Sequence, residues 1–130
     1  MPRKVLVTGG AGFIGSQVAD AFLARGDRVW IVDDLSTGRA ENVPAAAEFV
    51  HASITADAVP ALFRKVQFDL VSHHAAQVDV RKSVENPRHD ASINLDGFIN
   101  VVQSALEHGT KRVLFVSSGG LVRMEDAPGT

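Results

Sequence analysis

The chain of 130 residues contains no cysteine and no tyrosine, and it has a single tryptophan. Without cysteine it can form neither a disulfide framework nor a thiolate zinc site. The cysteine content therefore does not indicate whether the protein is located in a reducing or an oxidising compartment. No apolar run approaches the roughly 18 residues of a membrane span, and the start, MPRKVLV, meets a glycine-rich loop too soon for a signal peptide. We therefore expect a cytoplasmic protein with no membrane partner.

The charges show no excess of either sign that would indicate a partner. Lysine and arginine together number 13 against 15 aspartates and glutamates, and the two signs are interspersed. This balance argues against nucleic acid as the main partner. Hydrophobic residues make up 45% of the chain, which is enough for one core. We expect a single domain over residues 1–130.

The most informative segment is VLVTGGAGFIGS at residues 5–16, where an apolar strand leads into closely spaced glycines and then into a helix. Gly9, Gly12 and Gly15 fall three apart, and with Gly10 they also satisfy G-x-G-x-x-G. Such a loop gives a tight turn, a bare backbone for phosphate approach and a close helix–strand contact. The following helix directs its unpaired N–H groups at the phosphates. The segment predicts a site for the pyrophosphate of a dinucleotide.

An aspartate follows at the position that this fingerprint requires. Gly26 sits where a helix C-cap belongs, and the apolar run Val29 to Val32 then ends at Asp33. The fingerprint places an acid about 20 residues beyond the loop, where it accepts hydrogen bonds from the ribose hydroxyls. Because its charge repels a 2′-phosphate, NAD is favoured over NADP. The plainer alternative is an ordinary loop-capping aspartate after an ordinary glycine turn.

Strands and helices alternate along the chain, which predicts an α/β fold with a parallel sheet covered on both faces. We expect five strands, at residues 5–7, 29–32, 48–50, 68–72 and 113–116. Helices are expected after the glycine loop, at 57–65 and at 90–108, the last following a helical stretch broken at Pro87. Right-handed crossovers favour the order 3-2-1-4-5 of a Rossmann-like doubly wound sheet. This order places the ligand crevice between the first and fourth strands.

Five motifs occur in an order that resembles a known family: TGGAGFIGS, VDDLSTG, HHAAQ, SINLDG and FVSSGG. They are similar to the extended short-chain dehydrogenase/reductase family of NAD-dependent epimerases and dehydratases, and most closely to its UDP-glucose 4-epimerase branch. The resemblance covers residues 4 to about 122. It implies NAD as the cofactor and a UDP-sugar as the substrate of a complete isomerase.

The resemblance also implies a role for particular residues. The loop glycines with Phe13 and Ile14 would line the pyrophosphate, and residues 34–38 would wrap the adenine side. Residues 74–76 would form the floor near the nicotinamide, and Ser118 matches the active-site serine or threonine of the family. The expected cofactor-binding residues are Gly9, Gly12, Phe13, Ile14, Gly15, Asp33, Asp34, Leu35, Ser36, Thr37, Gly38, Ser53, Ile54, His74, Ala75, Ala76 and Asn94.

The chain departs from the family pattern at two places. Ser53 stands where the family has an aspartate that receives the adenine amino group, and a hydroxyl accepts that hydrogen bond more weakly than a carboxylate. Catalysis in the family depends on Tyr-x-x-x-Lys beyond the last strand, where the tyrosine takes the substrate hydroxyl proton while hydride passes to NAD. This chain has no tyrosine, and every lysine lies before the last expected strand.

Three functions therefore stay open. The first is the NAD-binding part of an epimerase, truncated before the UDP-sugar domain and inactive alone, with Ser118 as a relic or a backbone cap. The second is an epimerase or dehydratase completed by another chain. The third is a structural or regulatory module that has lost the ligand.

Two further expectations concern metals and assembly. We expect no metal site at His73 and His74, because neighbours in a strand point to opposite faces. Truncation would leave the strand at 113–116 without a neighbour and the helix at 90–108 uncovered. We therefore expect a homo-oligomer joined around residues 93–106 or 113–121.

Overall fold

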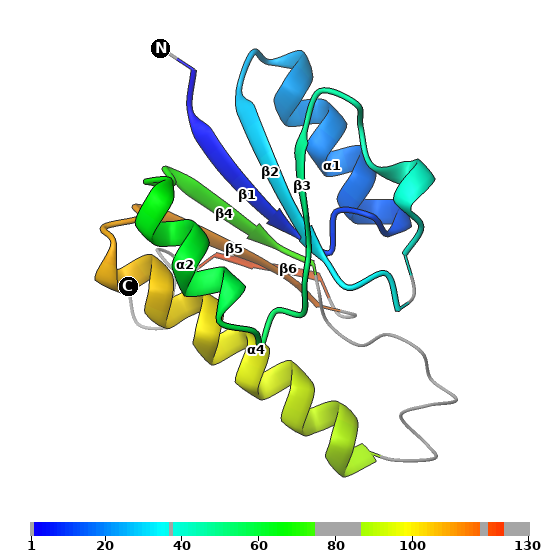
Figure 1. Ribbon diagram of the computed structural model, residues 1–130, viewed down its shortest axis with the longest axis vertical. Helices are drawn as coiled ribbons and strands as arrows, with labels where there is room; N and C mark the ends of the chain where they lie inside the picture. The colour runs from blue at the N-terminus through cyan, green and yellow to red at the C-terminus, as the bar shows by residue number, and fades with distance from the viewer. Residues whose placement is uncertain (1, 37, 75–86, 118–119, 124–130) are drawn as a thin grey trace.

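The computed structural model describes residues 2–36, 38–74, 87–117 and 120–123. The strands and helices alternate along the chain as the sequence predicts (Figure 1). In chain order the elements are β1 (Lys4–Thr8), α1 (Phe13–Ala24), β2 (Arg28–Asp33), the 3-10 turn η1 (Ala40–Asn42), β3 (Glu48–His51), α2 (Ala58–Lys65), β4 (Leu70–His73), α4 (Pro87–Glu107), β5 (Arg112–Ser117) and β6 (Gly120–Arg123).

The strands form one sheet in the order β3-β2-β1-β4-β5-β6. The first five strands are parallel, so the predicted order 3-2-1-4-5 is confirmed. Helix α1 covers one face of the sheet, and α2 and α4 cover the other (Figure 1). The carboxyl ends of β1 and β4, where the chain order reverses, are thus adjacent at one edge, which is where ligands bind in such sheets.

Alternating side chains of the strands fill two cores, because a parallel sheet between helices is buried on both faces. Leu6, Trp30 and Val71 pack in the cluster that includes residues of α2 and α4. Val7 and Ile31 pack in the cluster that includes residues of α1. Successive residues of one strand therefore belong to opposite cores, as the period of two requires.

The structure differs from the expectation at the last strand. Residues 113–116 were expected to have an unpaired edge, but β6 pairs antiparallel with β5 from Leu114↔Arg123 to Ser117↔Gly120. Two residues separate Ser117 from Gly120, which is the shortest common hairpin spacing, and Leu121 and Val122 favour strand structure. The expectation of an open edge at β5 is wrong, because the next segment of the same chain covers it.

The long helix expected from about residue 90 begins slightly earlier, at Pro87, and the helical stretch expected before Pro87 lies outside the described residues. Proline is tolerated in the first helical turn because its missing N–H would have no partner within the helix there. The expected C-cap of α1 is confirmed. Gly26 has a φ of +90°, and its N–H donates to the Leu23 carbonyl at 2.9 Å.

No helix within the described ranges is long and apolar enough to cross a membrane.

Candidate functional site

The glycine loop connects the carboxyl end of β1 to the start of α1. Gly9 has a φ of +71°, a conformation that costs glycine little, and its N–H donates to the Val32 carbonyl of β2 at 2.8 Å. The N–H of Gly12 turns back to the Gly9 carbonyl at 3.1 Å. The chain therefore makes a tight turn directly over the carboxyl ends of β1 and β2.

Gly12 and Gly15 have different surroundings. A Cβ on Gly15 would collide with the Gly9 carbonyl oxygen and lie 2.9 Å from the Gly9 carbonyl carbon, so this glycine allows the helix to approach the loop. A Cβ on Gly12 would meet only the Gly9 oxygen, at 3.3 Å. The space beside Gly12 is therefore left open by the protein itself, as expected of the glycine that faces a pyrophosphate.

The first turn of α1 presents its N–H groups beside this loop. No acidic residue lies in the turn, so no carboxylate neutralises the positive end of the helix dipole. Phe13 and Ile14 are 75% and 53% exposed, which is unusual for side chains of this type. The two side chains and the N–H groups together form a surface suited to an anion flanked by apolar groups.

The Asp33 carboxylate joins the glycine loop to the segment after β2. Its Oδ2 accepts the Ala11 N–H at 3.0 Å, and its Oδ1 accepts the Leu35 N–H at 2.7 Å. The side chain is buried, and Leu35 is held at a φ of 62°, which is rare for leucine. Each carboxylate oxygen has a second lone pair, so Asp33 can still accept hydrogen bonds from two ribose hydroxyls.

The segment after Asp33 folds back over the loop through Ala11. The Ala11 carbonyl accepts the Arg39 N–H at 3.0 Å and the Asn42 side-chain amide at 3.1 Å. A Cβ on Gly38 would lie 2.7 Å from the Ala11 carbonyl carbon, so close packing requires glycine there. Neither Ala11 nor Asn42 is predictable from a local sequence pattern, because their contacts join residues that are far apart in sequence.

Ser53 and Ile54 follow β3 on the other side of Asp33. The Ser53 hydroxyl accepts the Thr55 N–H at 3.2 Å and shares a hydrogen bond of 2.8 Å with the Thr55 hydroxyl. The Ile54 side chain is buried in the core, and its carbonyl accepts the Asn100 amide of α4 at 2.7 Å. These two contacts hold the segment after β3 against the core and α4.

His73 ends β4 and His74 follows it, and the two rings have different surroundings. His73 Nδ1 shares a hydrogen bond of 2.7 Å with the Thr8 hydroxyl, whereas His74 Nε2 shares one of 2.7 Å with the Ser72 hydroxyl. Burial, together with the neighbouring His74, lowers the pKa of His73 to about 4, and burial also lowers the pKa of His74. Both rings are therefore neutral near pH 7. No group of three metal-binding side chains occurs among the residues described.

The remaining predicted site residues lie after β2, in α4 and outside the described ranges. Asp34 and Ser36 lie in the segment between β2 and η1, where the Asp34 carboxylate accepts the Ser36 N–H at 2.9 Å. Asn94 lies in α4 and is partly buried. Four predicted residues lie outside the described ranges: Thr37, Ala75, Ala76 and Ser118.

Comparison with known proteins gives a consistent result. Residues 5–128 match the sequence profile of the NAD dependent epimerase/dehydratase family. The chain is 42% identical over 118 residues to a putative UDP-glucose 4-epimerase of Methanocaldococcus jannaschii, covering 91% of this chain and 39% of that protein. It is 41% identical over 124 residues to the UDP-glucose 4-epimerase of Mycolicibacterium smegmatis, covering 92% of this chain and 40% of that protein.

Solved structures agree with these matches. The Thermotoga maritima UDP-glucose 4-epimerase crystallised with UDP-glucose superposes with a TM-score of 0.87 at 38% identity, covering 89% of this chain and 38% of that one. The Thermus thermophilus UDP-glucose 4-epimerase in complex with NAD gives a TM-score of 0.85 at 42% identity, covering 90% and 38%. The chain thus spans about two fifths of the length of these relatives.

Proposed function

The chain belongs to the NAD dependent epimerase/dehydratase family, and from this membership we propose that it is the NAD-binding domain of a nucleotide-sugar epimerase similar to UDP-glucose 4-epimerase. The observation that carries the proposal is the open space beside Gly12, bordered by the start of α1 and by the Asp33 carboxylate. The domain over residues 1–130 supplies the cofactor half of such an enzyme.

The described residues fit NAD at each part of the molecule that they can reach. The N–H groups at the start of α1 hold the pyrophosphate beside Gly12, and Asp33 accepts the adenosine ribose hydroxyls. Leu35 and Ser36 border the adenine with Ser53, and His74 lies toward the nicotinamide. When bound, NAD takes up the hydride that leaves the substrate carbon. The chain's own part is to bind the cofactor and orient it.

The first experiment measures binding of NAD and NADP to the purified chain by calorimetry. We expect NAD to bind more tightly, because the Asp33 carboxylate repels a 2′-phosphate. Gly12→Val should abolish NAD binding while circular dichroism shows an unchanged fold, since the new side chain fills the pyrophosphate space. Ala24→Val, at the exposed end of α1, is the matched control and should bind NAD normally.

Three results would contradict this assignment. If NADP bound as tightly as NAD, the proposed role of Asp33 at the ribose would be wrong. Normal NAD binding by a folded Gly12→Val variant would remove the role of the glycine loop. Absence of NAD binding by the unchanged chain would favour the alternative of a structural or regulatory module.

The second part of the proposal is that the chain alone does not interconvert UDP-glucose and UDP-galactose. It has no tyrosine to take up the substrate hydroxyl proton, and loss of a general base typically lowers the rate by about 10²–10⁴-fold. A coupled assay on the pure chain should give the buffer rate. Turnover that survives Ser118→Ala would contradict the assignment, whereas turnover only after addition of a second chain would support the completed-enzyme alternative.

We also propose that copies of the chain associate through α4. Leu95, Ile99 and Leu106 are 60%, 49% and 74% exposed, and their spacing places them on one side of the helix. An apolar stripe of this kind favours contact with a second copy. Light scattering should show a dimer. Ile99→Glu should dissociate this dimer, whereas Ala21→Glu, at an exposed position of α1, should not. A monomer at high concentration would contradict the proposal.

A further inference from the structure

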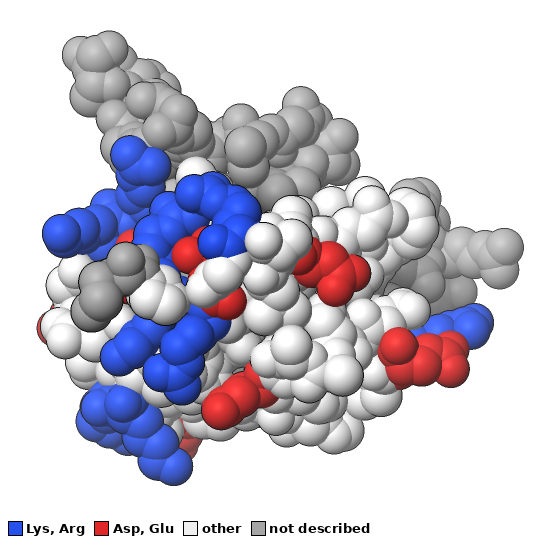
Figure 2. Space-filling view, turned by 90° about the horizontal axis from the view of Figure 1, so that it is seen from above, with Lys and Arg blue, Asp and Glu red and all other residues white. Residues whose placement is uncertain are grey.

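Positive charge gathers at the edge of the sheet opposite the glycine loop. The five parallel strands begin and α1, α2 and α4 end at this edge, which we call the amino-terminal edge. Figure 2 looks onto this end of the molecule and shows the lysine and arginine side chains clustered there, with few acidic ones between them. The cations at strand starts and helix ends are Arg3, Lys4, Arg25, Arg28, Arg64, Lys65, Lys111 and Arg112.

Helix dipoles explain only part of this cluster. Arg64 and Lys65 lie in the last turn of α2, where a cation is favoured by the negative end of the helix. At the strand starts, Arg3 pairs with Asp27, and the Arg28 guanidinium lies 4.9 Å from the centroid of the Trp30 ring. A cluster of like charges creates a local field that attracts an anionic partner.

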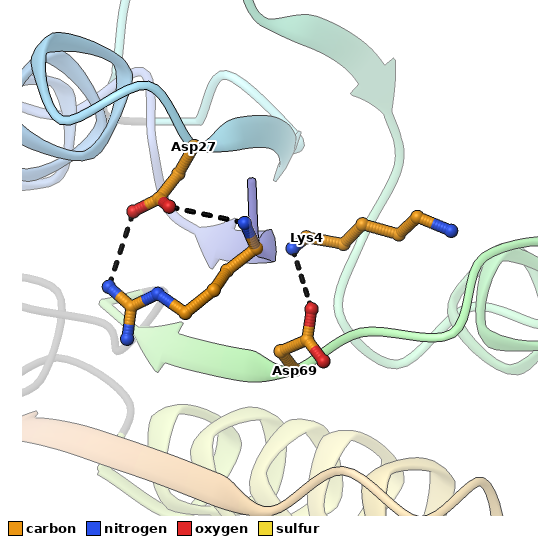
Figure 3. A network of polar contacts seen from close by, with 4 residues as sticks. Lys4, Asp27 and Asp69 are labelled. Carbon is orange, nitrogen blue, oxygen red and sulfur yellow. Dashed lines mark hydrogen bonds and ion pairs between the residues drawn. The ribbon is translucent and has the colours of Figure 1, made fainter. Parts of the chain in front are cut away.

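The acids of this edge are already engaged. The Asp27 carboxylate accepts the Arg3 N–H at 3.3 Å and the Arg3 guanidinium at 3.2 Å (Figure 3). Burial would raise the pKa of Asp27, but the hydrogen bonds from Arg3 outweigh it and hold that pKa below its usual value. Asp69 accepts the backbone N–H of Lys4 at 2.8 Å, while the Lys4 side chain extends away from Asp69 (Figure 3).

A hollow of about 720 Å³ lies within the cluster, between the start of β1 and the ends of α2 and α4. Three of its lining residues are cations, Lys4, Arg64 and Lys65, and no ion pair joins them to a carboxylate within the described chain. Its one acid, Glu107, accepts a hydrogen bond from the Gln103 amide at 3.2 Å. The hollow therefore offers several positive groups from separate elements to one ligand.

We propose that the amino-terminal edge binds an acidic polypeptide segment of a partner protein, seated in this hollow. An extended peptide advances about 3.3 Å per residue and alternates its side chains between two faces, so every second carboxylate can face the cations of β1 and α2. The site lies at the opposite edge from the glycine loop and does not depend on NAD binding.

The surroundings favour a peptide over nucleic acid. Single strands bind where exposed aromatic rings stack on bases, but Trp30, Phe63 and Phe68, which pack on one another near this edge, are at most 5% exposed. Readers of duplex DNA lay a helix or ribbon into a groove, whereas α1 and α2 end at this edge and do not lie along it.

The experiment measures binding of a fluorescein-labelled peptide of about twelve glutamates to the full chain by anisotropy. We expect binding at about 0.05 M salt that weakens strongly at about 0.5 M, because exposed charges are screened. The double variant Arg64→Gln/Lys65→Gln should bind about tenfold more weakly. The matched control Arg39→Gln/Arg88→Gln removes the same charge from exposed residues outside the cluster and should bind normally.

Three results would overturn the proposal. Equal weakening by both double variants would mean that only the net charge matters. Tighter binding of a labelled single-stranded DNA of the same length would favour nucleic acid. Salt-sensitive self-association that Arg64→Gln/Lys65→Gln abolishes would make a second copy of the chain the occupant. The NAD affinity of Arg64→Gln/Lys65→Gln should not change, which separates this test from that of the proposed function.

Discussion

The pH dependence of stability provides a sharp test of the buried polar contacts beneath the glycine loop. His73 is only 6% exposed at the end of β4, and its Nδ1 lies 2.7 Å from the Thr8 hydroxyl of β1. Burial, with the neighbouring His74, lowers its pKa to about 4 from an ordinary value of 6.5. The folded chain therefore holds this ring neutral at pH values where the unfolded chain protonates it.

The direction and size of the effect follow from that difference. Above pH 6.5 neither state binds the proton, so the full stability is present. As the pH falls from 6.5 toward 4, only the unfolded state gains a proton, so the free energy of unfolding decreases. The loss from His73 reaches about 2 kcal/mol at pH 5 and about 3 kcal/mol below pH 4. The lowered pKa of His74 adds a loss of the same sign.

Urea unfolding at pH 7.5 and pH 5, followed by circular dichroism, measures this loss. His73→Asn places an amide near the position of Nδ1 but takes up no proton, so it should remove most of the difference between the two pH values. His51→Asn is the control, because His51 is exposed and donates only to the Asp34 carbonyl. Equal stability of the unchanged chain at both pH values, or an undiminished difference in His73→Asn, would refute the reasoning.

Two further predictions concern glycines that allow close packing. Gly15→Ala should lower the free energy of unfolding by about 1–3 kcal/mol despite the better helix propensity of alanine, because the Cβ collides with main-chain atoms of Gly9 that cannot move aside. Urea denaturation checks this, and unchanged stability would show that the loop yields. Gly97→Ala should lower stability by a similar amount, since its Cβ would overlap the buried Ile54 side chain across from α4. A crystal structure of that variant with Ile54 unmoved would contradict the packing.

The sequence by itself determined the sheet order and predicted the central residues of the candidate site. The glycine spacing can be recognised in the sequence because each glycine is required by the local backbone. Gly9 adopts a positive φ, and Gly15 allows the helix to approach the main chain of Gly9 closely. The order of the five parallel strands follows because right-handed crossovers leave few alternatives. Asp33 could be predicted as a candidate site residue because the apolar strand preceding it places Asp33 at the carboxyl end of the sheet.

The tertiary structure alone decided the features that depend on contacts between distant segments. The pairing of β6 with β5 closed an edge that was expected to be open, because strand pairing depends on how the chain turns back. The contacts of Asn42 and Arg39 with Ala11 join parts of the chain that no local pattern connects. The net charge of −2 likewise gives no indication of the basic edge, because a sum of charges contains no information on where the strands begin and the helices end. Folding brings those ends together, and with them the cations that the sequence disperses.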